Sequence, residues 1–238
     1  MNLRRILFVA FAGVFLAPGA SFAQAPCCVL PDNGTGTADL PPNCVSGYNG
    51  SGQIADGLPP GSTIQIAARL ANFSSVVRGP GGGLGGEFQQ WNATFDMAMT
   101  GTGVYAAYNR FLVLNVVGET HTAPRTLFAP VQSFATDLFQ LQGQITLDSE
   151  FDLLRVTGGT GFGMPSPGQT TLTQSGPGWA VDSFFDITFR VDFVGNPAGP
   201  FAGRSGSTTN FIHRFEMCHE NPTPVEPASW GRLKASYR

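Results

Sequence analysis

Charged side chains are scarce in this 238-residue chain. They make up 12% of the residues, roughly half the share of an ordinary globular protein. Acidic residues outnumber basic ones by 16 to 13, and Lys234 is the only lysine. A protein that binds nucleic acid needs a basic surface to contact the phosphates. The composition therefore predicts no nucleic-acid partner.

Helical periodicity is also lacking until the last residues of the chain. Apolar and polar residues instead alternate with a period of two, which is typical of half-buried β-strands. The strongest example lies in residues 179–194, with Phe185, Ile187, Phe189, Val191 and Phe193 on one face. Residues 91–99 repeat the pattern from Trp91 to Met99. We expect these two strands to face each other from opposite layers.

Turn-forming residues separate the apolar runs. The chain holds 31 glycines and 18 prolines, and the runs between them give about nine to eleven strands. We find no internal repeat. This pattern predicts an all-β fold, an antiparallel β-sandwich or jelly-roll, with a β-barrel as the alternative.

Three segments follow one another along the chain. Residues 1–23 resemble a secretory signal peptide, with a basic start, an apolar run and a Ser21-Phe22-Ala23 cleavage site. The apolar run of about 11 residues is short for a membrane span, so we expect no transmembrane segment after cleavage. Residues 24–218 form one β domain with a turn-rich beginning at 24–61. We therefore predict a secreted or extracytoplasmic protein, in the periplasm, at the cell surface or in the medium.

Residues 219–238 differ from the domain in kind. A proline-rich linker precedes an aromatic and basic tail at 228–238, in which Trp230, Leu233 and Tyr237 have helical spacing. An isolated helix of this length is marginal in water, so the tail is expected to be helical or disordered. The alternative is a tail recognised by a surface-attachment or sorting system.

Four cysteines remain after signal cleavage, at Cys27, Cys28, Cys44 and Cys218. An even number in an exported protein predicts disulfides. Because a bond between neighbouring cysteines is strained, we expect one of Cys27 and Cys28 to pair with Cys44 and the other with Cys218. Spacing leaves open which of the two takes which partner.

Motifs for nucleotide, zinc and serine chemistry are incomplete. The glycine-rich run at 79–86 lacks the lysine and the helix of a phosphate-binding loop, and His213 and His219 lack zinc-hydrolase spacing. Ser205 lies in a Gly-Arg-Ser-Gly segment, with His121 and Asp137 earlier in the chain, as in trypsin-like proteases. That likeness covers four residues, so a turn is the expected reading. His213 is expected in the core beside Phe211, Phe215 and Met217.

Carboxylates offer two further hypotheses. Asp148, Glu150 and Asp152 are close enough in sequence to share a calcium ion, although we favour an ordinary solvated turn. Paired acids for glycoside hydrolysis would come from a larger set, Glu87, Asp96, Glu119 and Asp137. We assign no catalytic, cofactor-binding or metal-binding residue and expect no cofactor.

Aromatic side chains suggest a sugar-binding platform. Trp179, Tyr105 and Tyr108 lie at expected strand entries, where rings can remain accessible for stacking. Trp91 is in phase with Phe95 and is expected in the core.

Several longer segments carry a resemblance. They include DGLPPGSTI at 56–64, GGGLGGE at 81–87, PVQSFATDLFQLQGQI at 130–145 and WAVDSFFDITFRVDF at 179–193. In these segments the chain resembles exported β-rich proteins of environmental bacteria, planctomycete-like in character, a group with no established activity. The resemblance implies an extracytoplasmic bacterial domain and transfers no catalytic residue.

The expected function is a non-catalytic surface or extracellular protein with a structural or binding role. The alternative is a carbohydrate-binding module or a glycan-active enzyme. A surface glycan or another envelope component is the partner that both hypotheses share.

Overall fold

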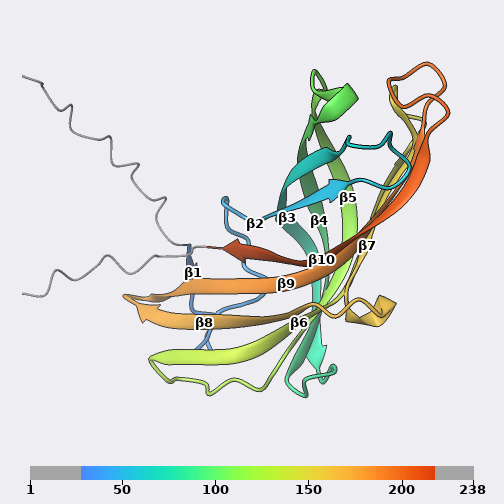
Figure 1. The fold of residues 1–238 in the computed structure, drawn as a ribbon. Helices are drawn as coiled ribbons and strands as arrows, with labels where there is room; N and C mark the ends of the chain where they lie inside the picture. Colours follow the sequence, from blue (N-terminus) through green and yellow to red (C-terminus); the bar gives the residue numbers. More distant parts are fainter. Residues whose placement is uncertain (1–27, 218–238) are drawn as a thin grey trace, which may run out of the picture.

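A computed structural model describes residues 28–217 of the chain. The predicted signal peptide at 1–23, Cys27, Cys218 and the predicted tail at 219–238 lie outside the described residues. Figure 1 shows the described part, which contains ten strands and two short 3₁₀ turns. In order, they are β1 (Val29–Pro31), β2 (Tyr48–Ile54), β3 (Ile64–Pro80), β4 (Glu87–Gly101), η1 (Gly103–Tyr105), β5 (Asn109–Thr122), β6 (Val131–Thr146), β7 (Phe151–Gly158), η2 (Thr160–Phe162), β8 (Pro167–Ser175), β9 (Gly178–Gly195) and β10 (Ser205–Met217).

The predicted all-β antiparallel fold is confirmed. All ten strands belong to one sheet; nine follow the order β1-β9-β10-β2-β3-β4-β5-β6-β7, and β8 lies off this path. Because β7 and β8 each pair with both β6 and β9, the pairings run round a closed ring. The two halves of this ring pack face to face across the core, as the two layers of a sandwich do. Because the strand pairings form a closed ring, the fold also has the feature that defines a β-barrel, the alternative predicted from the sequence.

The two strands with the strongest alternation do face each other. On β9 the five predicted apolar side chains, Phe185, Ile187, Phe189, Val191 and Phe193, are all at most 5% exposed. On β4, Phe95 lies with its ring centroid 6.4 Å from that of Phe189 and 6.0 Å from that of Phe215 on β10. These contacts join non-neighbouring strands, so they cross the core.

Residues 32–47 cover one end of the ring and are called the N-terminal plug below. Thr37 donates a hydrogen bond to the Oε1 atom of Gln132 at 2.7 Å, and the guanidinium of Arg125 donates to the Ala38 carbonyl oxygen at 2.7 Å. Leu40 is 3% exposed, and its carbonyl oxygen accepts a hydrogen bond from Arg78 at 2.6 Å. Backbone carbonyl groups of the plug therefore have hydrogen-bond partners on the strands and loops of the ring, while the plug fills the open end of the ring.

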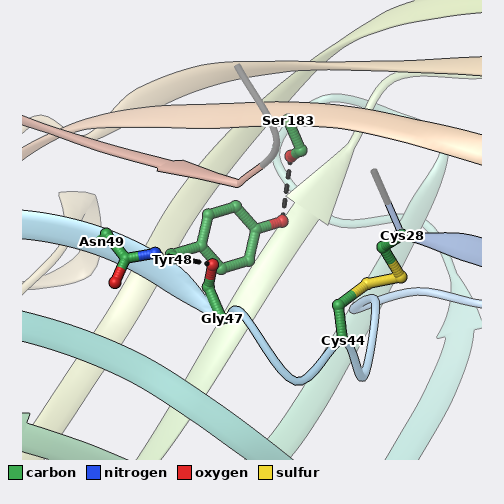
Figure 2. Close-up of a disulfide and its surroundings, with 6 residues drawn as sticks. All are labelled: Cys28, Cys44, Gly47, Tyr48, Asn49 and Ser183. Atoms are coloured by element: carbon green, nitrogen blue, oxygen red, sulfur yellow. Dashed lines mark hydrogen bonds between the residues drawn. A yellow bond between two sulfur atoms is a disulfide. The ribbon is translucent and has the colours of Figure 1, made fainter. Parts of the chain in front are cut away.

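One disulfide fixes the plug, between Cys28 and Cys44 (Figure 2). It is one of the two expected pairings for Cys44. Next to it, the hydroxyl groups of Tyr48 and Ser183 are 2.9 Å apart, and Ser183 contacts Thr170 at 2.7 Å. Hydroxyl groups thus link β2, β9 and β8 beneath the plug.

Aromatic rings fill the other end of the ring. Phe201 lies in the turn between β9 and β10 and is 1% exposed. Its ring centroid is 5.1 Å from those of Tyr105, Tyr108 and Phe151 and 6.1 Å from that of Phe193. This set of five residues is called the aromatic cap below.

Side chains complete the ring where β2 meets β10. The two strands share one backbone pair, between Asn49 and Glu216. Farther along, the Asn210 amide accepts a hydrogen bond from the Gln53 backbone N–H at 2.8 Å and donates to its carbonyl oxygen at 3.1 Å. The Thr208 hydroxyl accepts hydrogen bonds from the backbone N–H groups of Ala55 and Asp56.

Candidate functional site

The three carboxylates considered for calcium serve other partners. The guanidinium of Arg110 contacts Asp148 at 2.6 Å and Glu150 at 2.7 Å, while Asp152 accepts a hydrogen bond from Asn196 at 3.1 Å. The hydrogen bond from Arg110 lowers the pKa of Asp148, and burial raises the pKa of Tyr108, which donates to Glu150. A cationic side chain thus occupies the centre of this acidic turn. Residues 28–217 contain no group of three metal-ligating side chains placed to hold an ion.

The carboxylates considered for glycoside hydrolysis each contact a different partner. Glu87 binds Arg125 at 2.7 Å and Asp96 binds Arg69 at 2.5 Å. Asp137 accepts a hydrogen bond from Thr160 at 2.6 Å. The fourth acid, Glu119, lies on the outer face of β5 and is described below. Each acid therefore has its own separate environment.

The serine-protease hypothesis finds no support in the geometry. His121 lies opposite Asp137 in the β5–β6 register, but its Nε2 and Nδ1 atoms contact Glu119 and Gly83 instead. Ser205 begins β10 and pairs with Val194 of β9. No hydrogen bond joins Ser205 to either residue within the described chain.

The proposed sugar platform is wrong. Trp179 is 3% exposed, and its indole nitrogen donates to Asp32 at 2.8 Å. It is buried because β1 and the N-terminal plug cover this end of β9. Tyr105 and Tyr108 are partly buried within the aromatic cap. None of the three rings presents a free face of the kind that stacks on a sugar.

Two hollows that could hold a polar ligand lie on the outer face of β3, β4, β5 and β6; a separate hollow of about 350 Å³ lies between the plug and residues 122–127. Two adjoining depressions, of about 280 and 330 Å³, share Asn92 and Val117. Together they are called the amide groove. Its lining is mainly amide and hydroxyl side chains with one carboxylate: Asn72, Ser74, Ser75, Gln90, Asn92, Thr94, Asn115, Glu119, Gln140 and Gln142.

Strand register arranges the centre of the amide groove in rows. Gln90, Glu119 and Gln140 are directly opposite one another on β4, β5 and β6. Asn92, Val117 and Gln142 form the next row in the same way. Paired residues of neighbouring strands share a face, so amides flank a central carboxylate in one row and a central apolar side chain in the other.

Glu119 is held by two hydrogen bonds. Its Oε1 atom lies 2.7 Å from the Nε2 atom of His121, and its Oε2 atom accepts a hydrogen bond from Gln90 at 3.0 Å. The Nδ1 atom of His121 accepts from the Gly83 N–H at 3.1 Å, which assigns the ring proton to Nε2. The carboxylate therefore has a fixed orientation on its His121 side, because the imidazole is itself held by Gly83 and Phe139.

The glycine-rich turn explains why His121 stays in place. His121 is 5% exposed and stacks on Phe139, with ring centroids 4.5 Å apart. Gly82 has a φ of 79°, and a Cβ atom there would lie 2.9 Å from the imidazole. Only glycine lets the backbone approach this closely in this conformation. The glycine-rich run at 79–86, compared above with a phosphate-binding loop, thus covers the side chain of His121.

Irregularities in β3 form one wall of the amide groove. The β3–β4 register shifts twice between Ala71 and Val77. Asn72 and Ser75 have φ values of 58° and 52°, a left-handed conformation that costs about 1–3 kcal/mol in a non-glycine residue. The Asn72 amide donates to Thr94 at 3.0 Å. Such bulges re-aim side chains, and here they turn polar groups toward the groove.

The interior of the ring offers much less room. A hollow of about 20 Å³ lies beneath Leu40, Pro41 and Pro42 of the plug, which is room for about one water molecule. The buried hydroxyl of Thr136, which lines this hollow, has no hydrogen-bond partner in the described chain. The groove on the outer face is therefore the better candidate for a ligand site.

Comparisons with protein-family models, with curated proteins and with solved structures found no match. Within residues 28–217 no helix is long and apolar enough to span a membrane.

Proposed function

We propose that this protein is an exported, non-catalytic binding domain whose amide groove binds a glycan. The observation that carries the proposal is the pair of register rows, in which four amides surround Glu119 and Val117. An amide side chain both donates and accepts hydrogen bonds, as a sugar hydroxyl does. Val117 is 52% exposed and supplies an apolar contact for the carbon face of a sugar ring.

The fixed carboxylate adds orientation to this surface. Glu119 can accept hydrogen bonds from hydroxyl groups of a ligand, and its own position is set by His121 and Gln90. A preorganised group loses less freedom when a ligand binds. Glu119 accordingly fixes the position of one ligand hydroxyl group. The neutral amides around it form hydrogen bonds with the neighbouring hydroxyl groups and so select the ligand by their arrangement.

Binding is favoured over glycan hydrolysis. Glycosidases generally need two carboxyl groups flanking the bond that is cleaved, and Glu119 is the one carboxylate among the residues that line the groove. The extracytoplasmic location rests on the signal-like residues 1–23, on the resemblance to exported bacterial proteins and on the Cys28–Cys44 disulfide. A cell-envelope or extracellular glycan is the ligand class that fits this location.

A glycan array followed by calorimetry tests the proposal. We expect a neutral or hydroxyl-rich glycan to bind, and Asn92→Ala and Gln142→Ala each to weaken binding by about tenfold, since each removes one well-placed hydrogen-bonding group. Gln169→Ala is the matched control, because Gln169 is an exposed amide on β8, outside the groove. Absence of binding across a broad array, or binding that both groove variants leave unchanged, would contradict the proposal.

A further inference from the structure

One strand edge of the sheet has no partner. β5 pairs with β4 along its whole length from Asn109 to Thr122, but with β6 only from Val116 onward. The last β6 residue that pairs with β5 is Gly143, which lies opposite Val116. After Gly143, β6 pairs only with β7, as far as Thr146. Residues 109–115 therefore have a strand on one side only. Within residues 28–217 no strand other than β4 is in register with them.

A second unpaired edge, on β3, is protected. Beyond Leu70, β3 has lost its pairing with β2. That stretch carries two register shifts, the left-handed Asn72 and Ser75, and a terminal Pro80. Arg78 also ties it to the plug through the carbonyl oxygen of Leu40. Bulges, prolines and covering segments are the usual means by which proteins block edge-to-edge association.

Within the described chain, the β5 edge has no bulge and no proline, and its one tie to a neighbouring segment is that of Arg110 to Asp148 and Glu150 in the turn between β6 and β7. Its register with β4 shows no shift, and residues 109–115 contain neither proline nor glycine. Phe111 is 63% exposed and Val113 is 45% exposed on the outer face. A straight edge with exposed apolar side chains is a template for another extended chain. The chemistry of the edge thus requires a β-strand as its partner.

The sequence of this edge is complementary to itself. Residues 109–115 read NRFLVLN, with an amide at each end, Phe111 and Val113 between them and Leu112 at the centre. If two copies run antiparallel about a two-fold axis at Leu112, Asn109 lies opposite Asn115 and Phe111 lies opposite Val113. Moving the axis by one residue to Phe111 would instead place Asn109 opposite Val113. One register therefore matches amide with amide and apolar with apolar, and it keeps the two Arg110 side chains out of direct opposition.

We propose that two copies of this protein associate through residues 109–115 of β5, paired antiparallel about Leu112. An isologous contact of this kind closes at two copies, because each copy contributes the same edge. The sheet then continues from one molecule into the other. The outer faces of both β5 strands, with Val117 and Glu119 of each amide groove, lie on the same side of the joined sheet.

Sedimentation equilibrium on the mature protein tests the association. We expect a monomer–dimer equilibrium that Val113→Lys shifts toward monomer by at least about tenfold in dissociation constant, since lysine on an edge opposes strand pairing. Val131→Lys is the matched control: Val131 is 54% exposed but lies on β6, in register with Thr173 of β8. It is expected to leave the equilibrium unchanged, and circular dichroism checks that both variants are folded.

A crosslinking experiment tests the register independently of any effect on folding. Phe111→Cys protein mixed with Val113→Cys protein is expected to form an intermolecular disulfide under mild oxidation. Each variant alone is expected to form far less, because the proposed register offsets identical positions by two residues, too far for a disulfide. A wild-type protein that stays monomeric at all concentrations, a dimer that Val113→Lys leaves intact, or equal crosslinking by the single variants would overturn the proposal.

Discussion

The two ends of the strand ring are closed in different ways. The N-terminal plug closes one end with hydrogen bonds, among them those of Thr37, Arg78 and Arg125, and with the Cys28–Cys44 disulfide. The aromatic cap closes the other end with rings packed at centroid distances of 5.1 to 6.1 Å around Phe201. Figure 1 shows the contrast, with the turns of the aromatic cap at the top and the chain before β2 winding beside β8 and β9.

This difference follows from where each closing segment comes from. The aromatic cap combines Phe151 and Phe193 of β7 and β9 with rings from η1 and the adjoining turns, so it extends the core that the strands already make. The plug is a nearly strandless segment, and its backbone polar groups need partners when they are buried. Side chains of Gln132 and Arg125 supply these partners. One end therefore depends on apolar burial, and the other depends on hydrogen bonds and a covalent bond.

The largest effect is expected at the aromatic cap. Phe201→Ala should lower the free energy of unfolding by about 3–5 kcal/mol, since it removes a fully buried ring and leaves a cavity. Phe189→Ala, in the middle of β9, is the matched control and should cost the same. Urea unfolding measures both. A cost for Phe201→Ala below about 1 kcal/mol would mean that the cap is not part of the core.

Loss of the Cys28–Cys44 disulfide should lower the free energy of unfolding somewhat less than Phe201→Ala does. Replacing both Cys28 and Cys44 by serine is expected to cost about 3 kcal/mol, because the bond closes a short loop, the two cysteines being 16 positions apart. Hydrogen exchange should then quicken in residues 32–47 more than in β4. Exchange that rises equally at both ends would contradict the idea that the bond serves the plug.

Low pH should destabilise the end of the ring that carries the aromatic cap, because it weakens the ion pair between Arg110 and Asp148. Arg110→Gln is expected to cost about 1.5–3 kcal/mol at neutral pH, the usual contribution of hydrogen bonds to charged groups. The pKa of Asp148 is lowered in the folded state by Arg110, so this stabilisation is present above about pH 4, the ordinary carboxyl range, and is lost as the pH falls through the lowered value. The difference between wild type and variant should therefore shrink in acid. A difference that stays constant from pH 7 to pH 2.5 in urea titrations would argue against the ion pair.

The smallest effect is expected beneath the plug. Tyr48→Phe removes the hydroxyl that contacts Ser183 (Figure 2) but keeps the ring. Ser183 retains Thr170 as a partner, so the cost should be about 1 kcal/mol. Thermal unfolding with Tyr108→Phe as the comparison measures it. A loss above about 3 kcal/mol would show that this end is as sensitive as the aromatic cap.

Alternation in the sequence was a good guide to the regular strands and a poor one where a strand bends. It identified the buried faces of β4 and β9. It also placed Phe211 on the face of Phe215 and Met217, which is wrong: the β9–β10 register shifts between Asn210 and His213, and Phe211 is 73% exposed. A bulge adds one residue and reverses the phase, and a single sequence does not mark it. His213 lies after the bulge and keeps the phase of Phe215; it is half-buried, with its ring centroid 6.1 Å from that of Phe189 at the edge of the core.

The amide groove could not be read from the sequence for a related reason. Its polar residues were visible as the outward positions of β4, β5 and β6, notably Gln140 and Gln142. Their meeting depends on the register between strands, which sequence spacing does not give. The prediction for Trp179 was wrong for the opposite reason: the side chain was expected to be accessible and is buried. The segment that covers it lies about 140 residues earlier in the chain, as the hydrogen bond to Asp32 shows.

Disulfide pairing was partly predictable. The count and the context predicted oxidised cysteines, and the structure selects Cys28 as the partner of Cys44. The pairing of Cys27 with Cys218 lies outside the described residues and stays a prediction.

The seam between β2 and β10 has a consequence for how the chain folds. Asn210 and Gln53, which complete the ring there, are 157 residues apart in sequence. The ring cannot close until nearly the whole domain has been assembled, and such long-range pairings place a protein among the slow folders, in the millisecond-to-second range.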